Sequence, residues 1–235
     1  MKLAKITLTT LAAFVWAGTL AASDVFITEI ADPNNSSTTG RFVELYNIGS
    51  SDIDLSAAGY KIQRWTNDNA DPTPSSIKDL TGTIPAGGFY IICNDADKFS
   101  ATYGFDADQD IGTGGAADSN GDDQIAIVVG NNNTIVDMFG VAGEDGTGTA
   151  HEFEDGRAER VSTVTSGNAT WDAAEWDIDN DSGGGDGAQD APDDFDPNVW
   201  FTHTDPATAP TDAPAAPTAD AANVVSLFSD AYTDL

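Results

Sequence analysis

Short segments of alternating apolar and polar residues recur along the chain, separated by turn-forming residues. Runs of four to eight such residues, bounded by Gly, Pro, Asn and Asp, are typical of β-strands. After the N-terminus, no segment shows the 3.6-residue spacing of an amphipathic helix. The pattern predicts seven short strands, at residues 25–30, 42–47, 60–65, 89–94, 124–129, 134–139 and, more weakly, 158–164.

Turn signals lie between these segments. Gly130 and three asparagines separate residues 124–129 from residues 134–139, and this arrangement predicts a β-hairpin. About seven short strands punctuated in this way are typical of a β-sandwich of immunoglobulin-like size. We therefore predict an all-β chain, folded as an immunoglobulin-like β-sandwich with long acidic loops.

The charge of the chain changes the range of possible partners. The sequence has 9 Lys+Arg against 39 Asp+Glu, a net charge of −30, and 32 of the acidic residues are Asp. Asp favours turns and helix caps over helix interiors, in agreement with a loop-rich β protein. A surface this negative repels phosphate, so we expect neither nucleic-acid binding nor binding to anionic lipid.

The first 23 residues have the pattern of a secretory signal peptide. Two lysines precede an uncharged, mainly apolar stretch at residues 6–20, and small residues lie just before Asp24. The apolar stretch is too short to span a bilayer comfortably. The first cysteine is Cys93, so no cysteine near the cleavage site could carry a lipid anchor. We expect a secreted or cell-surface protein with no membrane span after cleavage and a charge of −32.

Composition divides the rest of the chain into four parts. Residues 24–178 hold the predicted sandwich, and residues 179–206 form an acidic extension, rich in Gly and Asp, that we expect to pack on it. Residues 207–222 contain Ala, Pro, Thr and Asp and predict a flexible linker. Residues 223–235 become apolar again and suggest the start of a truncated β module.

Two aromatic pairs share one spacing. Trp171 and Trp176 are five residues apart and so are Phe195 and Trp200, each first aromatic being followed by Asp. A structural repeat would explain this. The commoner reason is that each pair packs a long excursion of the chain against the sandwich, and this second explanation is our prediction.

Alternating carboxylates suggest a calcium site. Asp177, Asp179 and Asp181 could bring hard oxygen ligands to one cation. The helix–loop–helix calcium motif wants Gly at its sixth position and Glu at its twelfth, where Ser182 and Ala188 stand. Any calcium would therefore bind outside that motif. Asp106, Asp108 and Asp110 form a second, poorer alternation.

Candidates for catalysis are few. Residues 151–155, a His followed by two Glu and an Asp, could supply a general base or a carboxylate pair, but an exposed acidic strand edge is the commoner arrangement. Glu29 and Glu44 lie within apolar strands, where we expect them to bond Arg41 or backbone amides, or to face solvent. We expect Cys93 to be a buried thiol. We predict no catalytic residues and no required cofactor, with calcium as a possible ligand.

Several motifs resemble those of one known family. They are Ile27-Thr28-Glu29-Ile30, Val43-Glu44-Leu45-Tyr46-Asn47, Asp54-Leu55, Ile84-Pro85-Ala86-Gly87 and residues 120–127. In this order and spacing they resemble the lamin tail domain, over residues 25–139. The resemblance implies an immunoglobulin-like sandwich that acts as an accessory binding or adhesion unit. It supplies no catalytic residues.

The last residues carry a second, shorter resemblance. Residues 224–233 resemble the opening strand of a galactose-binding-like module. This implies that the chain is the N-terminal part of a longer polypeptide. The functional expectation is an exported, non-catalytic module that binds polysaccharide or a surface protein. The alternative is the N-terminal accessory fragment of a secreted hydrolase, polysaccharide-degrading or nuclease, whose catalytic domain lies elsewhere.

Overall fold

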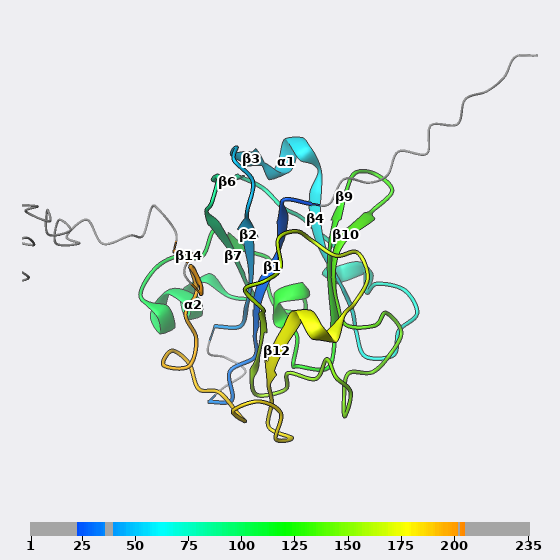
Figure 1. The fold of residues 1–235 in the computed structure, drawn as a ribbon, viewed down its shortest axis with the longest axis vertical. Helices are drawn as coiled ribbons and strands as arrows, with labels where there is room; N and C mark the ends of the chain where they lie inside the picture. Colours follow the sequence, from blue (N-terminus) through cyan, green and yellow to red (C-terminus); the bar gives the residue numbers. More distant parts are fainter. Residues whose placement is uncertain (1–22, 36–39, 202, 205–235) are drawn as a thin grey trace, which may run out of the picture.

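The computed structural model describes residues 23–35, 40–201 and 203–204. The predicted linker, the C-terminal β segment and all but the last residue of the predicted signal peptide lie outside these residues. Two β-sheets pack against each other (Figure 1), which confirms the predicted immunoglobulin-like sandwich. None of the helices in the described part has the length and apolar character that crossing a membrane requires.

The larger sheet has six strands. Neighbouring strands are antiparallel except for the pair β7 (Phe89–Cys93) and β8 (Gln109–Asp110), and β1 (Val25–Ala31) has a bulge between Ile27 and Glu29. The order across the sheet is β12 (Trp176–Asp179), β11 (Arg157–Arg160), β1 (Val25–Ala31), β2 (Phe42–Asn47), β7 (Phe89–Cys93) and β8 (Gln109–Asp110).

The smaller sheet has four strands and contains the predicted hairpin. β9 and β10 pair antiparallel around Gly130, as expected. The order is β10 (Thr134–Phe139), β9 (Gln124–Val129), β4 (Tyr60–Trp65) and β5 (Lys78–Asp79). Two further pairs join β3 (Ile53–Asp54) to β6 (Thr83–Ile84), and β13 (Val199–Trp200) to β14 (His203–Thr204).

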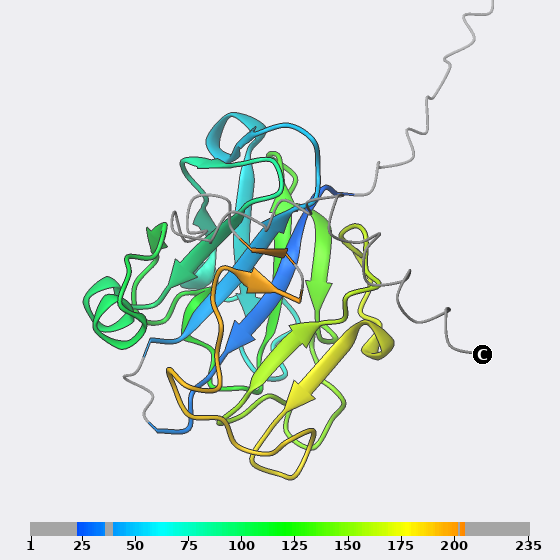
Figure 2. The same cartoon turned by 60° about the vertical axis from the view of Figure 1, so that its left-hand side comes forward.

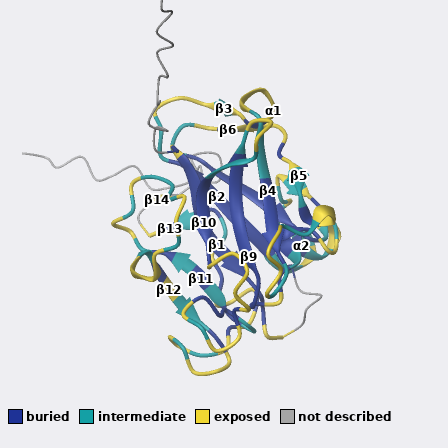
Figure 3. Cartoon of the chain, turned by 90° about the vertical axis from the view of Figure 1, so that its right-hand side faces the viewer, coloured by how far each residue is buried: buried dark blue, intermediate teal, exposed yellow. Residues whose placement is uncertain are grey.

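The main hydrophobic core lies between the two sheets. Figure 3 shows the central strands as buried and the connecting loops as largely exposed. Alternation along each strand turns one set of side chains inward, and removing this apolar surface from water is the main stabilising term of the fold. Fully buried members of this core are Ile27, Leu45, Ile62, Ile92, Ile127, Phe139 and Phe153.

Four of the seven predicted strands have the bounds that we expected, namely β2, β4, β9 and β10. The predicted strand 158–164 is shifted: β11 begins at Arg157 and ends at Arg160. The expectation of no amphipathic helix was wrong for α2 (Ala96–Tyr103). Asp95 caps this helix by accepting from the Lys98 amide, and eight residues are too few for a clear periodic signal. The shorter helices are α1 (Leu55–Ala58), η1 (Pro74–Ser76), η2 (Ala116–Asp118) and η3 (Ala173–Glu175).

The outer face of the larger sheet is also covered. Residues 189–200, which we call the strap, pass in front of β1 and β2 (Figure 2). In the strap, Phe195 meets Phe42 edge-on at 6.3 Å and Trp200 meets Phe26 at 5.5 Å.

The other aromatic pair packs on the opposite side of the same sheet. Trp171 and Trp176 lie 5.0 and 4.8 Å from the Phe139 ring in the main core. The prediction that each aromatic pair packs a long excursion against the sandwich is therefore confirmed.

Candidate functional site

A row of four carboxylates crosses the outer face of the larger sheet. Asp177 of β12 is opposite Glu159 of β11, Glu159 is opposite Glu29 of β1, and Glu29 is opposite Glu44 of β2. Directly opposed residues project to the same face of a sheet, and like charges in such pairs are destabilising. We call these four residues the acidic row.

One guanidinium balances much of the charge in and around this row. The Arg157 side chain lies 3.8 Å from a Glu29 oxygen and 3.6 Å from a Glu159 oxygen. It also lies 3.4 Å from Asp179 and 3.3 Å from Asp196 of the strap. Four carboxylates therefore share a single cation.

The centre of the row is buried. Glu29 is 2% exposed, and neither of its carboxylate oxygens accepts a hydrogen bond. Burial raises the pKa of Glu29 well above its ordinary value, and the charge of Glu44 adds to the increase. Glu29 faces Arg157 rather than Arg41, whose guanidinium instead lies 2.6 Å from Asp32.

Glu44 is held by two donors. Its carboxylate accepts from the Thr28 hydroxyl at 2.6 Å and from the Asn198 backbone amide of the strap at 2.6 Å. The expected bond to a backbone amide is thus present, while the alternatives, Arg41 and solvent, are not used. Burial raises the pKa of Glu44 well above its ordinary value, although both hydrogen bonds oppose the rise.

A second acidic group lies in the loops next to β12. Carboxylate oxygens of Glu152, Glu154 and Asp181 lie within 4.8 Å of one another. The Asp181 amide donates to the Glu154 carbonyl at 3.0 Å and the Asn180 side chain donates to the Glu152 carbonyl at 3.0 Å, so backbone contacts bring the two loops together. Within the part of the chain that the structure describes, these three carboxylates are the group that could hold a cation.

The three predicted calcium ligands do not gather at one point. Asp177 is exposed at the end of the acidic row. Asp179 lies 3.4 Å from Arg157 and accepts from the Asp186 amide at 2.7 Å. Of the three, Asp181 belongs to the group of carboxylates that could hold a cation, and its neighbours there are more than 25 residues away in sequence. In the second alternation, Asp108 and Asp110 accept from backbone amides near β7 and α2.

The residues that we considered for catalysis have structural roles. The segment 151–155 is a loop, so the expectation of an exposed strand edge was wrong: His151 and Glu152 are buried. Burial lowers the pKa of His151, whose Nδ1 lies 3.0 Å from the Thr149 hydroxyl. Cys93 is a buried thiol, as expected, and burial with the nearby Asp110 charge raises its pKa to about 11.

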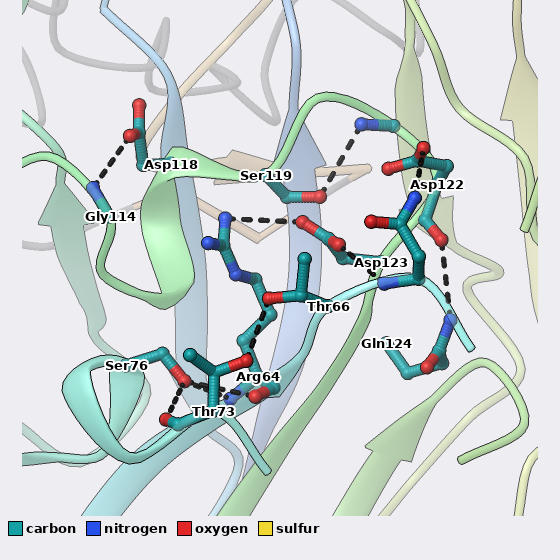
Figure 4. A network of polar contacts seen from close by, with 12 residues as sticks. Arg64, Thr66, Thr73, Ser76, Gly114, Asp118, Ser119, Asp122, Asp123 and Gln124 are labelled. Atoms are coloured by element: carbon teal, nitrogen blue, oxygen red, sulfur yellow. Dashed lines mark hydrogen bonds and ion pairs between the residues drawn. The ribbon is translucent and has the colours of Figure 1, made fainter. Parts of the chain in front are cut away.

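Buried ion pairs tie the loops to the sandwich. In Figure 4, Arg64 points toward Asp123, with a nitrogen–oxygen distance of 3.1 Å. The Asp123 carboxylate also accepts from the Asn67 amide at 3.1 Å. Nearby, Ser76 donates to the Arg64 carbonyl at 2.9 Å.

Most Lys and Arg side chains are paired with carboxylates, so the outer surface of the protein is acidic. Six of the seven Lys and Arg side chains after residue 23 have a carboxylate oxygen within 4 Å. Many carboxylates remain exposed on loops and strand ends. The surface that meets solvent is therefore dominated by negative charge.

The comparisons with known proteins agree with this architecture. A family model of the lamin tail domain matches residues 19–143, which is more than half of the chain. The lamin tail domain is a non-catalytic, immunoglobulin-like family. A search of curated proteins found no match. The matched range runs through both sheets, from β1 to the end of β10. The chain therefore belongs to the lamin tail domain family.

Proposed function

We propose that this protein is an exported, non-catalytic binding module of a multidomain surface or secreted protein, where it positions a neighbouring domain. One observation carries the proposal: its buried ionisable groups are engaged in holding the sandwich together. Arg64 pairs with Asp123, Arg160 with Asp137, and Glu44 with Thr28 and the strap. The signal-like N-terminus and the family assignment support it.

A protein partner is favoured over polysaccharide. Exposed aromatic rings could stack on sugars, but Trp65, Trp176 and Trp200 are each less than 10% exposed, and the half-buried Trp171 packs on Phe139. Among the described residues, the large aromatic side chain with substantial exposure is Phe201, at 48%. The acidic exterior fits a partner with basic side chains. The alternative function, an accessory fragment of a secreted hydrolase, uses the same sandwich beside a catalytic domain.

Binding to intact cells tests this proposal. The chain from Asp24 to Leu235 is expected to bind cells of the producing organism, and protease treatment of the cells should abolish the binding, because the partner is a surface protein. Periodate oxidation of cell-surface sugars should leave it unchanged. Loss of binding after periodate alone would identify polysaccharide as the ligand. Hydrolysis of a polysaccharide or nucleic acid by the purified chain would refute the non-catalytic function.

A second candidate function is calcium binding at Glu152, Glu154 and Asp181. Three converging carboxylates offer hard oxygen ligands, and backbone carbonyls and water would have to supply the rest of the six to eight that calcium takes. Such a site would tie the loop after β12 to the loop before β11.

Thermal melting tests the calcium site. Millimolar calcium is expected to raise the melting temperature of the chain by a few degrees, because a ligand that binds only the folded state stabilises it. Asp181→Asn should remove this increase. Asp177→Asn, an exposed carboxylate on the same segment, is the matched control and should keep it. Identical melts of the unaltered chain in calcium and in chelator would rule the site out.

A further inference from the structure

We propose that the strap is a proton-controlled cover over the acidic row: it stays closed while Glu29 and Glu44 hold protons and lifts as they ionise. The strap is residues 189–200, and the row is Asp177, Glu159, Glu29 and Glu44. This device is separate from the proposed binding function and does not depend on it.

The two ends of the strap and its middle rest on different surfaces. The first part of the strap joins an apolar cluster through Ala191 and Phe195, and Phe195 packs on Phe42. At the other end, Trp200 packs on Phe26, and its indole donates to the Arg160 carbonyl at 2.6 Å. Between these apolar anchors, the strap crosses the charged centre of the sheet, where its Asn198 amide bonds Glu44. Protonation of the row therefore acts on the middle of the strap.

The groups that face Glu29 and Glu44 are almost all acidic. The strands β11 and β12 contribute Glu159, Arg157, Asp177 and Asp179. The strap contributes Asp196. Helix α2 contributes Tyr103, whose hydroxyl is buried without a hydrogen bond. When the row is fully ionised, six carboxylates face one guanidinium. Asp196 is among the charges that disfavour ionisation of both Glu29 and Glu44. Ionisation therefore repels the strap itself as well as charging the sheet.

Lifting the strap is the easiest way to hydrate these charges. Alternate residues of β1 and β2, such as Ile30, Val43 and Leu45, face the main core, so water cannot reach Glu29 or Glu44 from that side without opening the sandwich. On the other side, among the described residues, the strap lies over the glutamates together with the Arg157 side chain and Tyr103 of α2. A buried ionised carboxylate is costly unless it is paired and hydrogen-bonded, and Glu29 accepts no hydrogen bond.

The direction of the pH effect follows from burial. Under the closed strap, burial holds the pKa of Glu29 and of Glu44 well above ordinary values. With the strap lifted, water reaches both groups and their pKa values fall toward about 4.3. Protons therefore bind the closed form more tightly. Lowering the pH closes the strap, and raising the pH through the closed-state pKa values opens it.

Hydrogen exchange of the strap amides tests this cover. In the chain from Asp24 to Leu235, protection factors of the Asn198 and Val199 amides are measured at pH 6.0 and 8.5 and corrected for intrinsic exchange rates. Dividing them by the protection factor of the β9 amides gives the strap-to-β9 ratio. The ratio is expected to fall about tenfold or more at the higher pH, since each unit of pKa difference is worth a factor of ten. Glu29→Gln should reduce the fall, because of the two buried glutamates only Glu44 is then left to ionise. Asp177→Asn, at the exposed end of the row, should retain it.

Two outcomes would overturn the proposal. One is a strap-to-β9 ratio that is the same at both pH values in the unaltered chain. The other is a Glu29→Gln variant with the full fall of the unaltered chain. If Glu29→Gln does not fold, Glu159→Gln replaces it, because this neighbour is partly exposed. Glu159→Gln should make the decrease of the strap-to-β9 ratio between pH 6.0 and 8.5 smaller. A decrease as large as that of the unaltered chain would contradict the proposal that the strap is a proton-controlled cover.

Discussion

Replacing Arg160 with methionine is expected to lower the free energy of unfolding by about 3–5 kcal/mol, the usual cost of breaking a buried ion pair. The Arg160 side chain is 1% exposed and bridges Asp137 and Glu175. It also donates to the Ile27 carbonyl and lies over the Trp176 ring at 4.3 Å. Methionine keeps part of the packing but leaves Asp137 buried without its cation. Urea unfolding at pH 7 measures the change.

An exposed ion pair provides the control for this substitution. Asp79→Asn breaks the contact between Lys61 and Asp79, whose charged atoms are 3.7 Å apart, and the Asp79 side chain is 81% exposed. Surface pairs of this kind contribute about 0–1 kcal/mol. A loss below about 1 kcal/mol for Arg160→Met would mean that the surrounding core compensates for the cation and that the buried network is not a major source of stability.

The second large effect is an increase in stability on mild acidification. Burial raises the pKa of Asp32 to about 6 and raises the pKa values of Glu29, Glu44 and Glu159 above their ordinary values. Their pKa values are higher in the folded chain than in the unfolded chain. The stability that they contribute is therefore fully present below the unfolded values near pH 4 and is lost as the pH rises through the folded values.

The free energy of unfolding is thus expected to rise by about 2 kcal/mol or more between pH 8 and pH 5.5, because each titrating group contributes about 1.4 kcal/mol per unit of pKa difference. His151 acts in the opposite direction, since burial lowers its pKa and favours its neutral form. Urea unfolding across this range measures the sum. Glu29→Gln should flatten the profile and Asp177→Asn should not. Maximum stability at pH 8 would contradict the expectation.

The strands were predictable where the sequence alternates between clear turns. Residues 124–129 and 134–139 lie on either side of a Gly-Asn turn, and their predicted bounds match β9 and β10. β12 was not predicted, because its four residues belong to a run of alternating Asp that also suggests a calcium loop. It becomes a strand through pairing with β11, a partner that local pattern does not reveal.

The candidate sites were less predictable because they depend on register. The predicted Asp181 does lie in a carboxylate group, but its neighbours Glu152 and Glu154 come from a distant loop. The acidic row requires the pairing of four strands and the bulge that turns Glu29 to the outer face. The sequence signal that pointed toward this row was the position of Glu29 and Glu44 within apolar strands. The sequence left open whether these glutamates bond a partner or face solvent, and it did not show their alignment across the strands.

The acidic exterior also sets the chemical conditions at the protein's own surface. A polyanion draws counter-ions toward itself, so protons and metal cations are more concentrated beside this protein than in the surrounding solution. Added salt reduces this enrichment, since at about 0.1 M the field extends only about 10 Å. Since six of the seven Lys and Arg side chains after residue 23 are paired with carboxylates, the chain has little positive charge to offset the field. Salinity and acidity therefore act on the same carboxylates, and the pH at which they ionise moves down as the salt concentration rises.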